Sequence, residues 1–456
     1  MTPMPTIPTV DQARLWQAHL DMAAIGATPE GGSNRPALSA EDAAARALLL
    51  SWCEPLHLHV ERDGIGNLFL RRAGREQRPA IAFGSHLDTV PTGGRFDGVF
   101  GVLAGLEVLR TLDAAGVVTA APLELVVWTN EEGSRFPPAM MGSRVHAGDL
   151  PLDRALTTPD DAGVTVAEAL AETFQIGFLT PAPRDWAAWI ELHIEQGPVL
   201  EQHGLEHSSD AVGGAAVGIV TGTVQARYFQ LTITGEASHA GPTTMDRRRD
   251  SLAAAAEMIL AVEQIGLSGE PGGRSSAAWI SNTPNARGAV PSQTRLHCDV
   301  RHEDPARAAA MEAAARIAWT AIAARRGVQL EIDPYAIFGP ARFDAELGAL
   351  LREVAGERQL RVRDMVAAAG HDSVMIAPLC PSAMVFVPSR GGVTHNPAEY
   401  TAPEHLAQGA QVLLDAVTRL ATNAARLATN AARLATQRCA AGELTLFGPG
   451  PSVTGQ

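Results

Sequence analysis

Residues 81–116, IAFGSHLDTVPTGGRFDGVFGVLAGLEVLRTLDAAG, join a short apolar run to a helix-like stretch through a glycine-rich loop. The apolar run covers 81–88 and the helix-like stretch covers 101–116. Further apolar, β-rich runs occupy 123–132, 189–197 and 383–389. Strands that alternate with helices predict an α/β domain with a mixed, largely parallel sheet. Because ligands of such sheets bind beyond the carboxyl ends of the strands, we expect the functional residues at that edge.

A second region interrupts this pattern and predicts an inserted α+β domain. It reads as strand, helix, strand, strand and helix up to about residue 330, and segments of the first kind resume at 367–378. We therefore expect a discontinuous first domain at 1–212 and 331–456 around an insertion at 213–330. The last part of the first domain, 419–456, begins with a repeated seven-residue unit, which predicts a helical extension before a Gly/Pro-rich tail.

Composition excludes several classes of function. The chain has 456 residues, and 50 acidic against 36 basic residues give a formal charge of -14, which argues against a nucleic-acid partner. All of the basic residues counted are Arg, so reactions that need a lysine amine, such as pyridoxal-phosphate catalysis, are excluded. The N-terminus has no signal-peptide pattern, and no apolar run approaches the roughly 18 residues of a membrane span. We expect a cytoplasmic protein without a membrane partner.

The cysteines bear on the kind of metal site that is possible. Their spacing indicates neither a disulfide framework nor a thiolate zinc site, so any metal must rest on histidine and carboxylate. The four are Cys53, Cys298, Cys380 and Cys439.

His86 is the first candidate ligand. A single histidine after a strand is usually structural, but here Asp88 follows two positions later and Asp97 lies in the adjoining glycine-rich loop. Glycines leave the backbone room to approach a ligand. Since residues i and i+2 of a strand share a face, Asp88 can reach the imidazole of His86 while the other ring nitrogen faces a metal.

Three further segments place histidine or glutamate at the end of an apolar run. They contain Glu131 and Glu132, His193, and His395. Adjacent residues of an extended chain point to opposite sides, so we expect one glutamate to bind metal and the other to hold water. Each segment would be unremarkable alone, because a solvated strand end has the same composition.

Together these side chains predict a dinuclear metal centre. Three imidazoles and two carboxylates, Asp97 and Glu132, suit Zn²⁺, Mn²⁺, Co²⁺ or Ni²⁺ better than Ca²⁺. If Asp97 spans two ions about 3.5–4 Å apart, His86 and His193 complete one position, and Glu132 and His395 complete the other. The residual positive charge of such a centre predicts a small-molecule substrate with an anionic group, such as a carboxylate.

Within a resemblance that runs from about residue 40 to 415, six motifs occur in order: SHLDTVPTGGRFDG, TNEEGSRF, MGSR, ELHIEQGPVLE, GEASHAGPTTMDRRRD and AGHDSVMIAPLCPSAMVFVPSRGGVTHNPAEYT. They closely resemble the hydantoinase/carbamoylase branch of the M20 metallopeptidase superfamily. That branch includes N-carbamoyl-L-amino-acid hydrolases, β-ureidopropionases and allantoate amidohydrolases. The resemblance implies two divalent metal ions per subunit, bound by a catalytic α/β domain. It also implies that the inserted domain is a lid that forms a homodimer.

The resemblance also implies roles for individual residues. Glu131 becomes the general base and Asp88 the residue that orients a ligand. The implied metal ligands are His86, Asp97, Glu132, His193 and His395. The implied substrate residues are Gln196, His239 and Arg301, with His239 reaching the active site of the other subunit.

One position departs from the family pattern. Relatives read P-N-A-x-N-V-I-P where this chain reads PNARGAVP, so Gly288 stands in place of an asparagine that helps Arg301 hold the substrate carboxylate. A missing donor changes which substrate is preferred. Asn285 or Gln293 are candidate substitutes.

The expected reaction is hydrolysis of a linear non-peptide C–N bond in an N-carbamoyl-L-amino acid, which gives the amino acid, ammonia and carbon dioxide. An N-acyl amino acid, allantoate or β-ureidopropionate are alternative substrates for the same metal chemistry, and Gly288 favours them by enlarging the pocket. A non-catalytic metal or amino-acid binding module is a different alternative, against which the presence of Glu131 argues.

Overall fold

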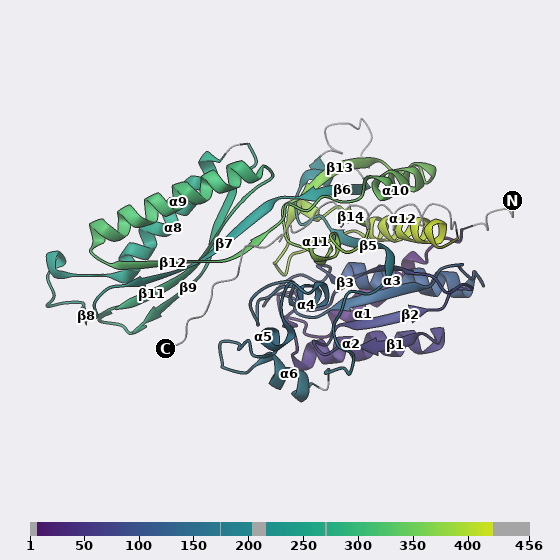
Figure 1. Ribbon diagram of the computed structural model, residues 1–456, viewed down its shortest axis with the longest axis horizontal. Helices are drawn as coiled ribbons and strands as arrows, with labels where there is room; N and C mark the ends of the chain where they lie inside the picture. The colour runs from purple at the N-terminus through teal and green to yellow at the C-terminus, as the bar shows by residue number, and fades with distance from the viewer. Residues whose placement is uncertain (1–6, 174, 203–215, 270, 423–456) are drawn as a thin grey trace. The chain divides into compact units, whose positions relative to one another are not determined.

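The computed structural model describes residues 7–173, 175–202, 216–269 and 271–422. The described chain divides into two compact units (Figure 1). The first contains the residues up to Thr221, Arg342–Met365, and the residues from His371 onward; the second contains Gly222–Ala341 and Val366–Gly370. Beyond Thr422 the predicted helical repeat, the tail and Cys439 lie outside the described residues.

An eight-stranded mixed sheet forms the centre of the first unit, in the order β1-β2-β4-β3-β5-β14-β6-β13. β4, β3, β5 and β14 are parallel, whereas β1–β2, β2–β4 and β14–β6 are antiparallel pairs. The strands are β1 (His59–Arg62), β2 (Leu68–Arg72), β3 (Ala80–His86), β4 (Leu123–Trp128), β5 (Trp186–Ile194), β6 (Val217–Thr223), β13 (Val362–Ala367) and β14 (Ser382–Val387). The predicted α/β fold with a mixed sheet and a parallel centre is confirmed.

Both faces of the central strands are buried. Alternate residues of β4 enter different cores: Leu123, Leu125 and Val127 join the larger one, whereas Val126 and Trp128 join the core on the opposite face. This double burial explains why the central strands read as continuous apolar runs rather than as an alternating pattern.

Helices cover the two faces of this sheet. α3 packs on β3 and β5 beside α12, with α1 and α10 against α12 (Figure 1). On the other face α11 packs on β5 and β14 and against α4. The helices are α1 (Gln12–Ala23), α2 (Ala40–Cys53), α3 (Val99–Ala114), α4 (Met141–Ala147), α5 (Leu152–Leu156), α6 (Val166–Glu172), α10 (Ala345–Glu357), α11 (Asp372–Ile376) and α12 (Pro403–Thr422), with 3-10 turns η1 (Glu54–Leu56) and η3 (Arg390–Gly392).

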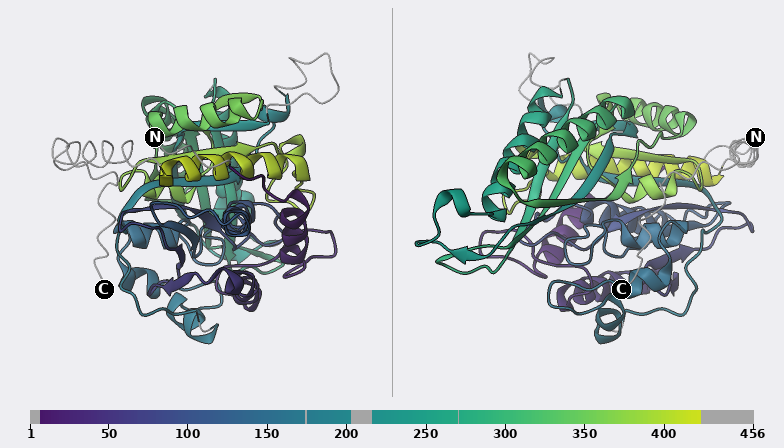
Figure 2. Two further views of the ribbon diagram at one scale, coloured as in Figure 1. Left: turned by 90° about the vertical axis from the view of Figure 1, so that its right-hand side faces the viewer. Right: turned by 60° about the vertical axis from the view of Figure 1, so that its left-hand side comes forward.

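The second unit contains a four-stranded antiparallel sheet, in the order β12-β7-β11-β9. The helices α8 and α9 lie side by side on one face of it, which the right-hand view of Figure 2 shows. The elements are β7 (Gln225–Thr234), β8 (Ser238–His239), η2 (Met245–Arg247), α8 (Ser251–Ser268), β9 (Arg274–Thr283), β10 (Ala289–Val290), β11 (Gln293–His302), α9 (Pro305–Arg326) and β12 (Gln329–Phe338). The order of strand, helix, strand, strand and helix is the one that the sequence predicted.

Clear sequence signals set the limits of α9. The Asp304 carboxylate accepts the N–H of Ala306, Pro305 occupies the first turn, and Gly327 ends the helix at φ 66°. The following strand β12 pairs with β7, from Gln329 opposite Thr234 onward. The second unit therefore runs to Ala341, whereas the sequence placed the end of the insertion near residue 330.

Among the described helices, α8 is the one that is long and apolar enough to cross a membrane. It packs against β9, β11 and α9, and Ala254, Met258 and Val262 lie in the core of the second unit. This packing accounts for the apolar residues on one side of α8, whereas Leu260 and Leu267 are 63% and 66% exposed. Within the described part of the chain, Cys53, Cys298 and Cys380 are buried and form no disulfide bond.

Candidate metal centre

The candidate ligands gather at one edge of the eight-stranded sheet. His86 is the last residue of β3, His193 is next to last in β5, Glu131 and Glu132 follow β4, and His395 follows β14. Because these four strands are parallel, their carboxyl ends meet at the same edge. Parallel pairing thus brings together side chains that lie far apart in the sequence.

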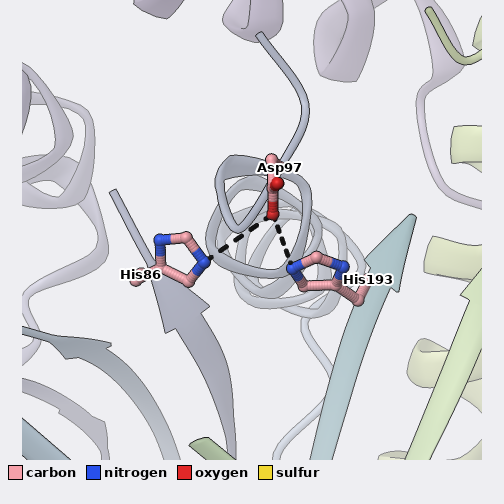
Figure 3. Close-up of side chains that lie close together, drawn as sticks. All are labelled: His86, Asp97 and His193. Carbon is pink, nitrogen blue, oxygen red and sulfur yellow. Dashed lines mark ion pairs between the residues drawn. The ribbon is translucent and has the colours of Figure 1, made fainter. Parts of the chain in front are cut away.

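One oxygen of Asp97 faces two imidazoles (Figure 3). Its Oδ1 lies 3.0 Å from Nε2 of His193 and 3.9 Å from Nε2 of His86. All three side chains are buried, and one ligand atom from each lies within 4.8 Å of the others. The spacing suits a single cation.

The other oxygen of Asp97 faces a second group. Its Oδ2 lies 3.2 Å from Nε2 of His395, which is 3.5 Å from Oε2 of Glu132. These three residues also offer ligand atoms within 4.8 Å of one another. His395 is 48% exposed, so this group is open on one side whereas the first group is closed.

Backbone carbonyls orient two of the imidazoles. Nδ1 of His86 donates to the carbonyl of Asp88 (2.9 Å), and Nδ1 of His193 donates to the carbonyl of Ile194 (2.8 Å). Nε2 is therefore the nitrogen of each ring that faces Asp97 and that could bind a metal ion. This second contact of a ligating histidine is typical of metal sites.

Asp88 does not hold His86 in the way that the sequence suggested. Its carboxylate is 3.7 Å from Nδ1 of His86, beyond a good hydrogen bond. It accepts instead the backbone N–H groups of Glu131 (3.2 Å) and Glu132 (3.1 Å). Asp88 therefore orients His86 through its backbone carbonyl and the two glutamates through its side chain.

Glu131 lies beside the first group in a strongly anionic setting. Its Oε2 is 3.5 Å from Nε2 of His86, and its side chain is buried. Burial, followed by the charges of Asp372, Glu132 and Asp88, raises the pKa of Glu131 well above its ordinary value. A carboxylate with a raised pKa accepts a proton more readily, as general-base catalysis near neutral pH requires.

The charges of the site fit a divalent cation. Against the effect of burial, the hydrogen bond to Asp97 raises the pKa of His193 to about 9. A separate hydrogen bond, from His395 to Asp97, is the largest of the effects that raise the pKa of His395 to about 9. The buried Oε1 of Glu132 has no hydrogen-bond partner among the described residues. The site thus attracts positive charge and offers a buried oxygen to hold it, and nitrogen with carboxylate donors suits Zn²⁺ and related ions.

Two glycines of the loop make room for side chains of this site. A Cβ on Gly98 would collide with the imidazole of His86, and a Cβ on Gly94 would collide with the carboxylate of Glu399. The glycine-rich loop was expected to leave room for a ligand. It leaves room for the side chains of His86 and Glu399, which lie around Asp97.

Glu399 was not found by sequence reasoning. It is buried, and it accepts the backbone N–H groups of Phe96 (2.8 Å) and Asp97 (3.1 Å). The paired glycines were the signal available, because they indicate a close contact. They do not identify a partner 303 residues away from Phe96.

Gln196, a predicted substrate residue, lies beside the second group. Its Nε2 donates to Oδ2 of Asp97 (2.8 Å), and its backbone adopts φ 60°. Its buried Oε1 has no partner among the residues that the structure describes. The amide thus has one end on a candidate ligand and an unused acceptor at the other.

The other two predicted substrate residues lie in the second unit. His239 is exposed at the end of β8, opposite Ala289 of β10, and Gly288 is next to that pair. Arg301 on β11 donates to Asp299 (2.7 Å) and to the carbonyl of Ala368 (3.1 Å), and its guanidinium lies over the Tyr228 ring. These contacts orient Arg301 from three sides.

Comparisons with known proteins agree with this chemistry. The sequence profile of the peptidase family M20/M25/M40 matches residues 82–419. An N-carbamoyl-L-amino-acid amidohydrolase of Rhizobium meliloti is 36% identical over 90% of this chain and 97% of its own length. An allantoate amidohydrolase of Bacillus subtilis is 34% identical over 88% of this chain and 95% of its own length. A solved hydantoinase/carbamoylase family amidase of Burkholderia vietnamiensis is 41% identical, with a TM-score of 0.87 over 91% of this chain and 98% of its own.

Proposed function

Because this chain belongs to the peptidase family M20/M25/M40, a family of metal-dependent hydrolases, we propose that it hydrolyses the ureido C–N bond of an N-carbamoyl-L-amino acid. The products are the amino acid, ammonia and carbon dioxide. The observation that carries the proposal is the position of Asp97, whose two oxygens face separate groups of donors. The name of the similar Rhizobium protein supports the choice of substrate.

Two divalent ions per subunit would be held by these groups. His86, Asp97 and His193 would hold one, and Asp97, Glu132 and His395 the other. Zn²⁺ is our first choice, and Mn²⁺, Co²⁺ and Ni²⁺ suit the same donors. Such ions polarise a substrate carbonyl and lower the pKa of water toward neutrality.

The protein's own groups perform the proton transfers. Glu131 takes the proton of the attacking water and returns it to the leaving nitrogen, and its buried position beside His86 supports this role. The Asp88 carboxylate accepts the backbone N–H groups of Glu131 and Glu132. These two hydrogen bonds keep the general base, Glu131, and the candidate ligand, Glu132, in fixed relative positions.

Three further residues would bind the substrate: Gln196 of the first unit, and His239 and Arg301 of the second. Arg301 pairs with the substrate carboxylate, Gln196 offers its free amide oxygen to the ureido group, and His239 donates to the oxyanion that develops. A contribution of about 10²–10³ in rate is typical of such a donor. Following the family resemblance, the enzyme is a homodimer through the inserted unit, and His239 acts in the partner's site. Its exposure is consistent with that role.

The location that we propose is the cytoplasm. The buried side of α8 belongs to the core of the second unit, and the charge of -14 is unsuited to nucleic acid. The partners of the protein are then its small substrate and a second copy of the chain.

Allantoate, β-ureidopropionate and N-acyl amino acids are the second candidate substrates. Gly288 supports them, because nothing lies within 4 Å of the position of a Cβ there. Gly288 leaves space beside His239 that the family asparagine would fill, so a substrate of different shape can be accepted there.

A substrate panel tests the proposal. The metal-loaded enzyme would be given N-carbamoyl-methionine, N-carbamoyl-β-alanine, allantoate and an N-acyl-aspartate, and released ammonia and amine would be measured. The proposal expects the highest kcat/KM with N-carbamoyl-methionine. Turnover of the N-acyl compound alone, with no ureido compound cleaved, would reject it.

A further inference from the structure

The two groups around Asp97 are held with different firmness. His86 and His193 lie on strands and are 2% and 1% exposed. His395 lies in a loop, is 48% exposed, and has φ 50°. A left-handed backbone costs about 1–2 kcal/mol for a residue other than glycine. The segment that carries His395 therefore needs a contact that keeps it in place.

Glu399 supplies that contact. Its Oε1 accepts the N–H groups of Phe96 and Asp97, and its Oε2 accepts the hydroxyl of Thr394 (2.9 Å). One carboxylate thus joins the loop of Asp97 to the residue before His395. Gly94 lets the carboxylate approach, because no Cβ fits there.

Thr394 connects the same parts a second time. Its Oγ1 lies 3.2 Å from Oδ2 of Asp97, the oxygen that faces His395. A hydroxyl has a single proton, so the carboxylates of Asp97 and Glu399 share it. Two further bonds, from the N–H of Glu399 to the Asn396 carbonyl (3.0 Å) and from the N–H of Ala398 to the Asn396 side chain (2.9 Å), stay within the segment. They cannot hold the segment to Asp97.

The loop of Asp97 is less dependent on Glu399. The N–H of Val99 donates to the Asp97 carbonyl (2.7 Å), the N–H of Phe100 donates to the Phe96 carbonyl (2.9 Å), and Gly98 contacts His193. These bonds belong to the start of α3. Loss of Glu399 would therefore loosen the His395 segment at Thr394, whereas Asp97 stays beside His86 and His193.

We propose that Glu399 is a positioning residue for the open half of the metal pair. It keeps His395 beside Asp97 and Glu132, so retention of the ion held by these three residues depends on it. Retention of the ion held by His86, Asp97 and His193 does not. The inference rests on the dinuclear site of the proposed function, and it assigns the two ions different lability.

Metal titration tests this inference. Chelator-stripped protein would be titrated with Zn²⁺ alone by calorimetry, and bound ions would be counted by native mass spectrometry. Glu399→Ala is expected to bind the first ion as the wild type does and the second ion about 10–100-fold more weakly, as loss of an outer contact typically produces. Glu399→Gln keeps an oxygen for both N–H groups and should bind two ions. Glu404→Ala, an exposed change five residues away, is the matched control.

Thr394→Val provides a second variant should Glu399→Ala fail to fold, and it is expected to weaken the same ion. The inference is overturned if the variants weaken both ions equally, if neither ion is weakened, or if the wild type binds a single ion. Selective loss of one ion from a protein that cleaves none of the substrates in the panel would support this inference while rejecting the proposed function.

Discussion

Gly98 lies directly against the imidazole of His86, and a Cβ at this position would collide with the ring atoms Cε1, Nε2 and Cδ2. The N–H of Gly98 lies 3.1 Å from Nε2 of His193, and its φ is 66°. The residue between Asp97 and α3 thus touches two of the candidate ligands. The absence of a side chain at this position lets β3, β5 and the Asp97 loop approach one another.

Gly98→Ala is expected to weaken metal binding at least tenfold, because the methyl group displaces His86. Gly116→Ala is the matched control, since Gly116 has φ 64° with nothing within 4 Å of a Cβ. Both variants bear the strain of a positive φ, and only the first bears the collision. Metal content after dialysis distinguishes them. Equal metal content in the two variants would contradict the explanation.

Glu131→Gln is expected to lower kcat by about 10²–10⁴, the usual contribution of a general base. Glutamine has nearly the same shape and cannot take the proton of water. Metal content should equal that of the wild type, because Glu131 is not among the five candidate ligands. Steady-state rates with elemental analysis of the same sample check both statements. A variant that keeps full activity would show that another group is the base.

Arg301→Lys is expected to raise KM for a carboxylate substrate about 10–100-fold, with a smaller change in kcat. Hydrogen bonds to charged groups contribute about 1.5–3 kcal/mol, and lysine cannot reproduce the planar fork of arginine. Arg295→Lys is the control, because Arg295 lies on the same strand β11 and is exposed. Rates over a range of substrate concentrations separate KM from kcat. If the two substitutions raise KM equally, Arg301 does not bind the substrate carboxylate.

Gly288→Asn is expected to fold and to lower KM for N-carbamoyl-L-amino acids about tenfold, by restoring a charged hydrogen bond of about 1.5 kcal/mol. The backbone has φ 84° with open space around it, and asparagine tolerates positive φ better than most residues. Gly288→Ala adds a Cβ without the amide and serves as control. If both variants change KM alike, the amide has no role.

A mixed dimer of His239→Ala and Glu131→Gln chains is expected to recover part of the wild-type activity. One chain lacks His239 and the other lacks the general base Glu131. If His239 acts across subunits, a dimer that contains one chain of each kind has one active site with both residues intact. At random mixing about half of the dimers are of this kind. Activity would be measured against each homodimer, with the mixed species verified by mass. If the mixed dimer recovers no activity, His239 acts in the active site of its own subunit or in neither active site.

Local sequence was enough to find the sheet and the edge at which function is concentrated. The apolar runs that end at His86 and His193 are properties of consecutive residues, and parallel strands place their carboxyl ends together wherever the rest of the chain goes. The candidate ligands could be recognised for this reason, and the family motifs added Gln196, His239 and Arg301 as expected substrate residues.

Contacts between distant segments required the folded molecule. The Asp88 carboxylate serves the two glutamates rather than His86, Glu399 reaches a loop 303 residues away, and β12 joins the second unit by pairing with β7. Hydrophobic periodicity predicts which side of an element is buried, but it does not predict which other element covers that side. Those pairings depend on how helices, loops and strands pack simultaneously, so they are settled by the energy of the whole fold.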